Sequence, residues 1–213
     1  MFALPMTFIL TNDDGIDAPG IQALGQSLEQ LGHSNWCMVA PMGQLSGCSH
    51  QVTRSLPLEI SVRSDRSFAV SGTPADCTRA ALAHLVPNAS LVLSGINAGG
   101  NLGADIYVSG TVAAVREAVL HRVPGIAFSR YIRNREPIDW AIASRLTARV
   151  LEKLLASPIK EGTFWNVNLP HVSASDVEAN GEPQIIECPL CTQPLPMEHR
   201  VDERGLSFIG RYD

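Results

Sequence analysis

Short apolar runs of strand length alternate with segments of helical periodicity through most of this 213-residue chain. Residues 7–11 (TFILT) combine apolar and β-branched side chains, and we interpret them as a buried strand. Residues 21–31 then place isoleucine and leucine at three- and four-residue steps, which is typical of one helical face. Residues 36–40 return to a strand pattern. Because parallel strands are joined by such crossovers, this unit predicts two parallel strands with a right-handed connection.

The same alternation continues toward the C-terminus and predicts the fold class. Further strands are expected at residues 91–94, 125–128 and 164–168, helices at 74–85, 110–120 and 138–155, and a hairpin from 56–62 and 67–70. We therefore predict a three-layer, doubly wound α/β fold with a mostly parallel sheet in residues 1–170. Residues 171–213 are rich in proline and show no helical period, so we expect an extended arm or hairpin there, with short strands at 184–187 and 206–209.

Charge and composition exclude several classes of protein. The net charge is −5, which excludes a nucleic-acid binder that works through bulk positive charge. No run of 18 apolar residues predicts a membrane span, and residues 1–10 lack the positive segment of a signal peptide. The odd number of cysteines, five, suits reduced thiols and a cytoplasmic protein. Cys188 and Cys191 have CxxC spacing, but without a second ligand pair we interpret them as incidental.

A cluster of polar residues, Asn12-Asp13-Asp14-Gly15, follows the first predicted strand. In a parallel sheet, ligands bind beyond the carboxyl ends of the strands. Two adjacent carboxylates converge only where the chain bends, and Gly15 permits a bend. Because the carboxylates repel each other and no Lys or Arg precedes Arg54, a hard cation such as Mg²⁺ or Mn²⁺ would relieve them. The alternative is a turn that leads into a helix capped by Asp17.

Two further polar clusters follow later strands. Residues 94–103 (SGINAGGNLG) could cradle an anion with backbone N–H groups, and the amides of Asn97 and Asn101 could bind metal or phosphate. A tight loop is the alternative for this segment. Ser109-Gly110-Thr111 begins a predicted helix whose N-terminus suits a phosphate, and an ordinary N-cap is the alternative there. Together the three clusters indicate metal-assisted phosphoryl chemistry.

Other catalytic templates do not occur in the sequence. There is no GxSxG or HExxH motif, and the six histidines are dispersed. His50 lies near Ser46 in sequence and is either a site residue or a solvated loop histidine. Arg130, Arg133 and Arg135 follow a predicted strand, where they either draw anionic substrates to its carboxyl end or lie in a solvated loop.

With these clusters in hand, the chain resembles the survival protein SurE family, whose members are metal-dependent nucleoside monophosphate phosphatases. The matching stretches are residues 10–21 (LTNDDGIDAPGI), 39–49 (VAPMGQLSGCS), 71–77 (SGTPADC), 92–103 (VLSGINAGGNLG), 107–118 (YVSGTVAAVREA), 123–129 and 166–170. The similarity therefore runs in order through residues 6–170. The combination of NDDGxxAPG with SGINxGxNLG is highly specific.

The resemblance implies roles for individual residues. Four residues would hold one divalent cation per subunit, Mg²⁺ or Mn²⁺: Asp13, Asp14, Ser46 and Asn97. Four others would line the phosphate pocket: Asn101, Ser109, Gly110 and Thr111. The ligand role of Ser46 rests on the resemblance alone. Residues 72–77 (GTPADC) match a family motif whose role we interpret as partly structural.

The expected activity is hydrolysis of nucleoside 5′-monophosphates, and of 3′-monophosphates, to nucleoside and phosphate. Asp13 or Asp14 would orient or deprotonate the attacking water. Family members usually continue past the position of Asp213, so we expect the arm at 171–213 to be shortened. Family arms exchange between subunits, which implies a homodimer or homotetramer. The alternative function is a non-catalytic nucleotide or phosphate sensor that lost turnover with the shortened arm.

Overall fold

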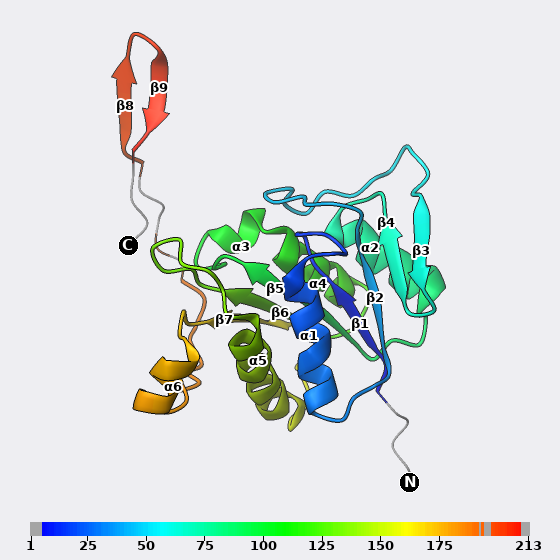
Figure 1. The fold of residues 1–213 in the computed structure, drawn as a ribbon. Helices are drawn as coiled ribbons and strands as arrows, with labels where there is room; N and C mark the ends of the chain where they lie inside the picture. Colours follow the sequence, from blue (N-terminus) through cyan, green and yellow to red (C-terminus); the bar gives the residue numbers. More distant parts are fainter. Residues whose placement is uncertain (1–5, 192, 194–196, 210–213) are drawn as a thin grey trace.

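The computed structural model describes residues 6–191, 193 and 197–209 of the chain (Figure 1). Seven strands form one sheet in the order β3-β4-β2-β1-β5-β6-β7. β3 runs antiparallel to β4, and the other neighbouring strands are parallel. The strand bounds are β1 Phe8–Thr11, β2 Trp36–Pro41, β3 Ile60–Ser64, β4 Ser67–Val70, β5 Leu91–Ala98, β6 Gly125–Arg130 and β7 Phe164–Leu169.

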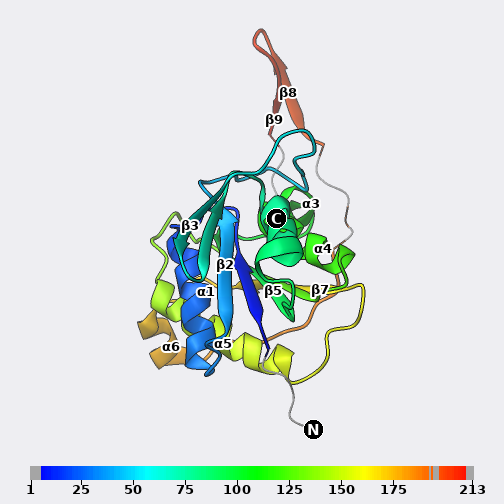
Figure 2. The same ribbon diagram turned by 90° about the vertical axis from the view of Figure 1, so that its right-hand side faces the viewer.

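Helices cover both faces of this sheet (Figures 1 and 2). Their bounds are α1 Pro19–Gln30, α2 Pro74–Ala80, α3 Asp105–Val108, α4 Gly110–Leu120, α5 Trp140–Leu155 and α6 Ala174–Asn180, and a π-helical turn at Ala81–Leu85 continues α2. Phe8 and Leu10 of β1 pack in the core beneath α1 and α5, and Ile9 between them packs toward α2 and α4. The predicted three-layer, doubly wound fold is confirmed. In the described part of the chain, no helix is long and apolar enough to cross a membrane.

The strand order creates a crevice at the carboxyl edge of the sheet. β1 lies between β2 and β5, so the chain connections leave β1 in opposite directions. At such a switch point the loops beyond the strand ends diverge and leave room for a ligand. The loops that follow β1, β2 and β5 all meet at this edge. The loops after β1 and β2 carry Asp13 and Ser46. Asn97 is the last residue but one of β5.

Two details of this region differ from the expectation. The N-cap of α1 is Ala18, which makes no side-chain capping bond, so the expected cap by Asp17 is wrong. Pro19 lies in the first helical turn, where its fixed φ favours the start of the helix although no side chain caps it. β5 is longer than expected, because Asn97 and Ala98 continue to pair with β6 after a shift of register. Glycine and asparagine are rare in strands, so the sequence pattern does not indicate this extension of β5, which backbone pairing with β6 stabilises.

The C-terminal segment also contains a helix that the sequence pattern did not predict. Ser173 and Asp176 start α6 with a reciprocal capping box, in which Asp176 N donates to Ser173 Oγ at 3.1 Å and Ser173 N donates to Asp176 Oδ2 at 2.8 Å. The helix is only two turns long, which is too short for an apolar period to be visible. Residues 184–187 form no strand, contrary to the expectation.

The predicted hairpin of the arm is present but placed differently. β8 (His199–Asp202) pairs antiparallel with β9 (Gly205–Phe208), and this two-stranded sheet extends away from the main sheet (Figures 1 and 2). Each residue of both strands is exposed. The strand expected at 206–209 corresponds to β9. Pro194 and Pro196, which contributed to the expectation of an extended arm, lie outside the described residues.

Candidate active site

The turn after β1 places two adjacent aspartates at the crevice. The side chain of Asn12 accepts a hydrogen bond from Gly15 N at 3.1 Å and donates one to Gly15 O at 2.7 Å, so the chain folds back sharply. Gly15 has a φ of +102°, a conformation that glycine adopts without steric cost. Asp13 is only 5% exposed, and Asp14 is half-buried. The predicted bend at this position is confirmed.

Asp13 packs directly against the start of α4. Thr111 Oγ1 donates a hydrogen bond to Asp13 Oδ1 at 2.5 Å. A Cβ atom on Gly110 would lie 2.8 Å from the Cβ of Asp13, so only glycine lets the helix approach this closely. The structure therefore brings together the first and third polar clusters, which are far apart in the sequence.

The electrostatics of the aspartate pair are unusual for a surface turn. Within the described part of the chain, no Lys, Arg or His forms an ion pair with either aspartate. Burial raises the pKa of Asp13 to about 6, the Thr111 hydroxyl opposes this shift, and the charge of Asp14 adds to it. Burial also raises the pKa of Asp14, whose Oδ2 accepts a hydrogen bond from Ala98 N at 3.2 Å. A bound cation would stabilise both ionised carboxylates.

Two other segments reach the same turn. Leu45 N donates to Asp13 O at 2.7 Å, which holds the loop after β2 against the turn after β1. Ser46, the next residue, is exposed. Asn97 lies near the end of β5 and donates from Nδ2 to Gly99 O at 2.8 Å, so Oδ1 is the atom of this amide that could bind a cation. All four residues of the expected ligand set thus lie on segments that meet at the crevice.

The donor atoms in these segments fit a hard cation. Two carboxylates, a hydroxyl and an amide carbonyl offer only oxygen, which is the ligand type that Mg²⁺ and Mn²⁺ prefer. Among the residues that the structure describes, no group of three or more His, Cys, Asp or Glu could hold a metal. The oxygens of Ser46 and Asn97 are further candidate ligands beside the two aspartates.

The residues expected to line a phosphate pocket have structural roles as well. Ser109 Oγ accepts a hydrogen bond from Val112 N at 3.1 Å, so this side chain is the N-cap of α4. Asn101 is buried and donates from Nδ2 to Ser129 Oγ at 2.8 Å. Its backbone N donates to Asn168 Oδ1 at 2.8 Å, and its backbone O accepts from Asn168 Nδ2 at 3.0 Å. These bonds hold the glycine-rich loop against β6 and β7. At the start of α4, Ser109 N donates to Asp105 O at 2.9 Å, and the backbone of Thr111 bonds to Asp13.

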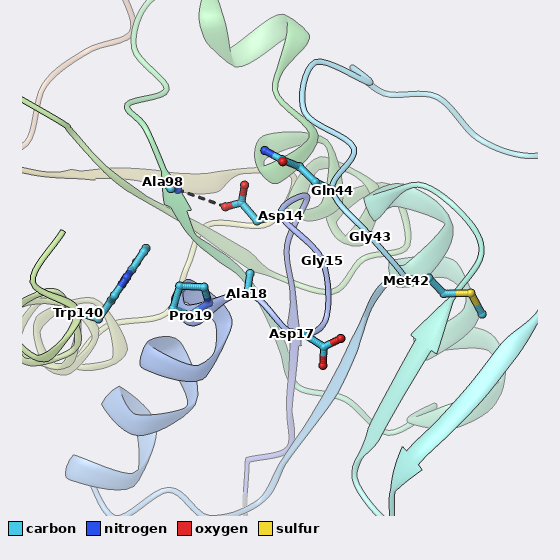
Figure 3. Close-up of a pocket in the computed structure, with 11 residues that line it drawn as sticks. Asp14, Gly15, Asp17, Ala18, Pro19, Met42, Gly43, Gln44, Ala98 and Trp140 are labelled. Carbon is cyan, nitrogen blue, oxygen red and sulfur yellow. Dashed lines mark hydrogen bonds between the residues drawn. The ribbon is translucent and has the colours of Figure 1, made fainter. Parts of the chain in front are cut away.

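A cavity of about 360 Å³ opens beside Asp14 (Figure 3). Figure 3 shows Trp140 and Pro19 on one side of it, and Met42 and Gln44 from the loop after β2 on the other. The sequence did not single out Met42, Gln44 or Trp140, because no spacing pattern connects them with the aspartates.

Two expectations about basic residues are corrected. His50 Nε2 lies 2.7 Å from Glu117 Oε2 of α4, so His50 is engaged in a hydrogen bond and is not a solvated loop histidine. Arg130 is fully buried, and its Nη2 donates to Val172 O at 2.6 Å. A buried guanidinium is no surface charge that could attract substrate. Arg133 and Arg135 are exposed, as either expectation for them required.

The fold and the aspartate turn define a class, namely a doubly wound α/β protein with a candidate oxygen-ligand cation site at its topological switch point. The family model described as survival protein SurE matches residues 8–186 of the chain. The chain belongs to the SurE family, and the resemblance noted in the sequence is confirmed.

Similar proteins cover most of the chain. A Nostoc sp. protein provisionally named as a 5′-nucleotidase is 49% identical over 207 residues, which span 97% of this chain and 88% of the relative. The 5′-nucleotidase SurE of Carboxydothermus hydrogenoformans is 38% identical over 95% of this chain and 78% of its own length. The crystal structure of a SurE protein from Aquifex aeolicus has a TM-score of 0.78 and 34% identity, and covers 93% of this chain and 79% of that chain.

Proposed function

We propose that this protein is a metal-dependent 5′-nucleotidase that hydrolyses nucleoside 5′-monophosphates, and 3′-monophosphates, to nucleoside and phosphate. The observation that carries the proposal is the adjacent pair of buried Asp13 and half-buried Asp14, without a basic partner among the described residues, with Asp13 packed against the start of α4. The names of the relatives support the same activity. The alternative of a non-catalytic nucleotide sensor is not favoured, because relatives along nearly the whole chain are named for catalysis.

The proposed cofactor is one divalent cation per subunit, Mg²⁺ or Mn²⁺. Asp13, Asp14, Ser46 and Asn97 would hold it, and their oxygen-only donor set supports this choice. When bound, such an ion supplies Lewis acidity toward a phosphate oxygen and lowers the pKa of water.

The chain's own groups would perform the remaining tasks. Asp13 or Asp14 orients the attacking water and accepts its proton. The Ser109-Gly110-Thr111 segment begins helix α4, and the partial positive charge of this helix N-terminus would stabilise negative charge on the phosphoryl oxygens. Asn101 would support this pocket by fixing the glycine-rich loop, through the bonds of its side chain and backbone to β6 and β7.

The nucleoside would occupy the cavity beside Asp14. Its volume, about 360 Å³, lies in the range of small-molecule sites. Trp140 offers an aromatic wall on which a base could stack, as aromatic side chains do for nucleobases elsewhere. A phosphate between Asp14 and the start of α4 would then point its ester oxygen toward this cavity.

Phosphate release from AMP and GMP tests the proposed activity. We expect release with Mn²⁺ or Mg²⁺ and none with EDTA. Asp13→Asn should lower kcat/KM at least about 100-fold, because the variant loses a carboxylate ligand of the proposed cation. Asp65→Asn, which changes an exposed acid in the turn between β3 and β4, is the matched control and should behave as wild type. Nucleotide binding by wild type without metal-dependent phosphate release would support the sensor instead.

The proposal extends to the organisation of the protein. Residues 1–170 would form the catalytic core, 171–213 an arm, and two or four chains would assemble through such arms. The exposed hairpin of β8 and β9 supports the assembly, because an isolated two-stranded hairpin is marginally stable in water. A cytoplasmic location is proposed on the state of the five cysteines, all of which are described and free.

A further inference from the structure

Asp76 is a buried carboxylate whose charge the proposed chemistry does not use. It is 1% exposed and lies in the first turn of α2, within the GTPADC segment. Part of its role is local, since it forms a capping box with Thr73. Thr73 N donates to Asp76 Oδ2 at 3.0 Å, and Asp76 N donates to Thr73 Oγ1 at 3.2 Å.

The same carboxylate also binds the long loop between β2 and β3. Thr53 N donates to Asp76 Oδ1 at 2.9 Å, and Thr53 Oγ1 donates to Asp76 Oδ2 at 2.8 Å. Beside it, Thr73 Oγ1 donates to Gln51 O at 2.6 Å. No basic side chain forms an ion pair with Asp76 within the described residues, so its negative charge is stabilised by amide and hydroxyl donors.

This loop carries Ser46, which is exposed and whose hydroxyl accepts a hydrogen bond from Gln44 Nε2 of the same loop at 2.9 Å. Its position therefore depends on anchors on either side. Upstream, Leu45 N binds Asp13 O. Downstream, Ser49 Oγ donates to Tyr107 O at 2.9 Å, and the bonds to Asp76 follow. Ordering a long loop costs conformational entropy. Each anchor orders part of the loop before the metal binds, so less of this entropy loss opposes metal binding.

We propose that Asp76 is a positioning residue: through Thr53 it clamps the β2–β3 loop so that Ser46 is held at the aspartate turn. This inference rests on the proposed function, in which Ser46 is a metal ligand. It predicts that loss of the clamp weakens metal binding without removing any ligand.

The chain contains its own matched control. Ser173 and Asp176 form a second capping box with the same pattern of bonds, at 2.8 Å and 3.1 Å, at the start of α6. Asp176→Asn thus removes a cap alone, whereas Asp76→Asn removes a cap together with the clamp. Thr53→Val keeps the cap of α2 and removes the hydroxyl bond of the clamp, and Thr53→Ser restores that bond.

The experiment measures Mn²⁺ binding by calorimetry and amide hydrogen exchange of residues 44–53, on the full chain. Thr53→Val should raise the dissociation constant of Mn²⁺ about tenfold, the lower range for residues that support metal ligands, and speed exchange in the loop. Asp76→Asn should do both more strongly. Thr53→Ser and Asp176→Asn should match wild type. At saturating Mn²⁺ the kcat of Thr53→Val for AMP should return to within about threefold of wild type, a split that mere loss of stability would not give.

Two results would overturn the clamp and leave the proposed function standing: wild-type Mn²⁺ affinity in Thr53→Val, or unchanged loop exchange in that variant. If Asp76→Asn fails to fold, the comparison of Thr53→Val with Thr53→Ser still tests the clamp. If wild type binds no Mn²⁺, the proposed function fails, and the exchange rates alone judge whether Asp76 orders the loop.

Discussion

Asp13 illustrates how closely one residue of the site is fitted to its neighbours. Its carboxylate is buried, accepts a hydrogen bond from Thr111 and lies against the backbone of Gly110. Burial without a counter-ion raises its pKa to about 6, because the ionised form is poorly solvated there. A bound cation would stabilise that ionised form. The packing leaves no space for a larger residue at the start of α4.

Gly110→Ala should therefore damage the site without unfolding the protein. The added Cβ would lie 2.8 Å from Asp13 Cβ and 3.0 Å from Cys48 Sγ, and the former cannot move aside freely. We expect kcat/KM for AMP to fall at least about tenfold, because displaced metal ligands are costly. Gly25→Ala, in the middle of α1 with its nearest new contact at 3.4 Å, is the control and should keep full activity. Equal activity of both variants would contradict this account of Asp13.

Trp140→Ala tests the cavity at the same scale. If a base stacks on Trp140, the variant should raise KM for AMP about tenfold, since stacking on an aromatic side chain contributes about 1–3 kcal/mol per base. KM for a phosphate monoester without a base, such as p-nitrophenyl phosphate, should not rise. A parallel rise for both substrates would indicate general damage to the fold, and Trp140→Phe, which keeps an aromatic wall, separates the two cases.

Helix α4 connects the site with the loop that carries Ser46. Its N-terminus contacts Asp13, and one turn before its end Glu117 binds that loop through His50. Arg79 of α2 and His121 also contact Glu117, at 2.5 Å and 3.0 Å, although Glu117 itself is 1% exposed. Burial would raise the pKa of Glu117, but the hydrogen bonds from Arg79, His50 and His121 outweigh it and lower the pKa below its ordinary value.

The lowered pKa of Glu117 predicts a pH-dependent stability. Because the pKa is lower in the folded state, the contribution is present above the unfolded pKa, about 4.3, and is lost as the pH falls through the folded value. Glu117→Gln should lower the free energy of unfolding by about 1–3 kcal/mol at pH 7, by weakening hydrogen bonds to a charged group. The difference from wild type should shrink below pH 4. Urea unfolding at both pH values measures it, and a gap that does not depend on pH would contradict the assignment.

At the scale of the whole molecule, the hairpin of β8 and β9 extends away from the main sheet, and its strand residues are all exposed (Figures 1 and 2). Val201 and Leu206 pair across it and are 76% and 67% exposed. Apolar side chains on an exposed two-stranded ribbon are typical of a surface that another chain covers.

Measurement of mass in solution tests the proposed assembly. We expect two or four chains at micromolar concentration. The double variant Val201→Thr with Leu206→Thr places β-branched residues, which favour strands, at both positions but removes apolar surface. It should shift the measured mass toward that of a monomer. Glu203→Gln in the hairpin turn is the control and should leave the mass unchanged. A monomeric wild type would contradict the proposed assembly.

The fold could be predicted because its signals are local. Buried strands and amphipathic helices each leave a period in the sequence, and the switch-point rule then places the loops after β1 and β5 together. Ser46 had no such signal, since a hydroxyl in a polar loop is uninformative without a family. The partners of His50 and Arg130 could not be predicted either, because Glu117 and Val172 lie far away in sequence. Contacts of that kind come from tertiary packing, which no period encodes.

The expected ligands of the cation come from separate stretches of the chain, after β1, after β2 and at the end of β5. An unfolded chain would not hold this set of oxygens together, so the ion would bind the native state far more tightly. By mass action, free Mn²⁺ at 100 times its dissociation constant would stabilise the protein by about 2.7 kcal/mol, and the melting temperature should fall when a chelator is added. Metal supply would then govern the lifetime of the molecule in the cell, through its resistance to proteolysis, and not only its turnover.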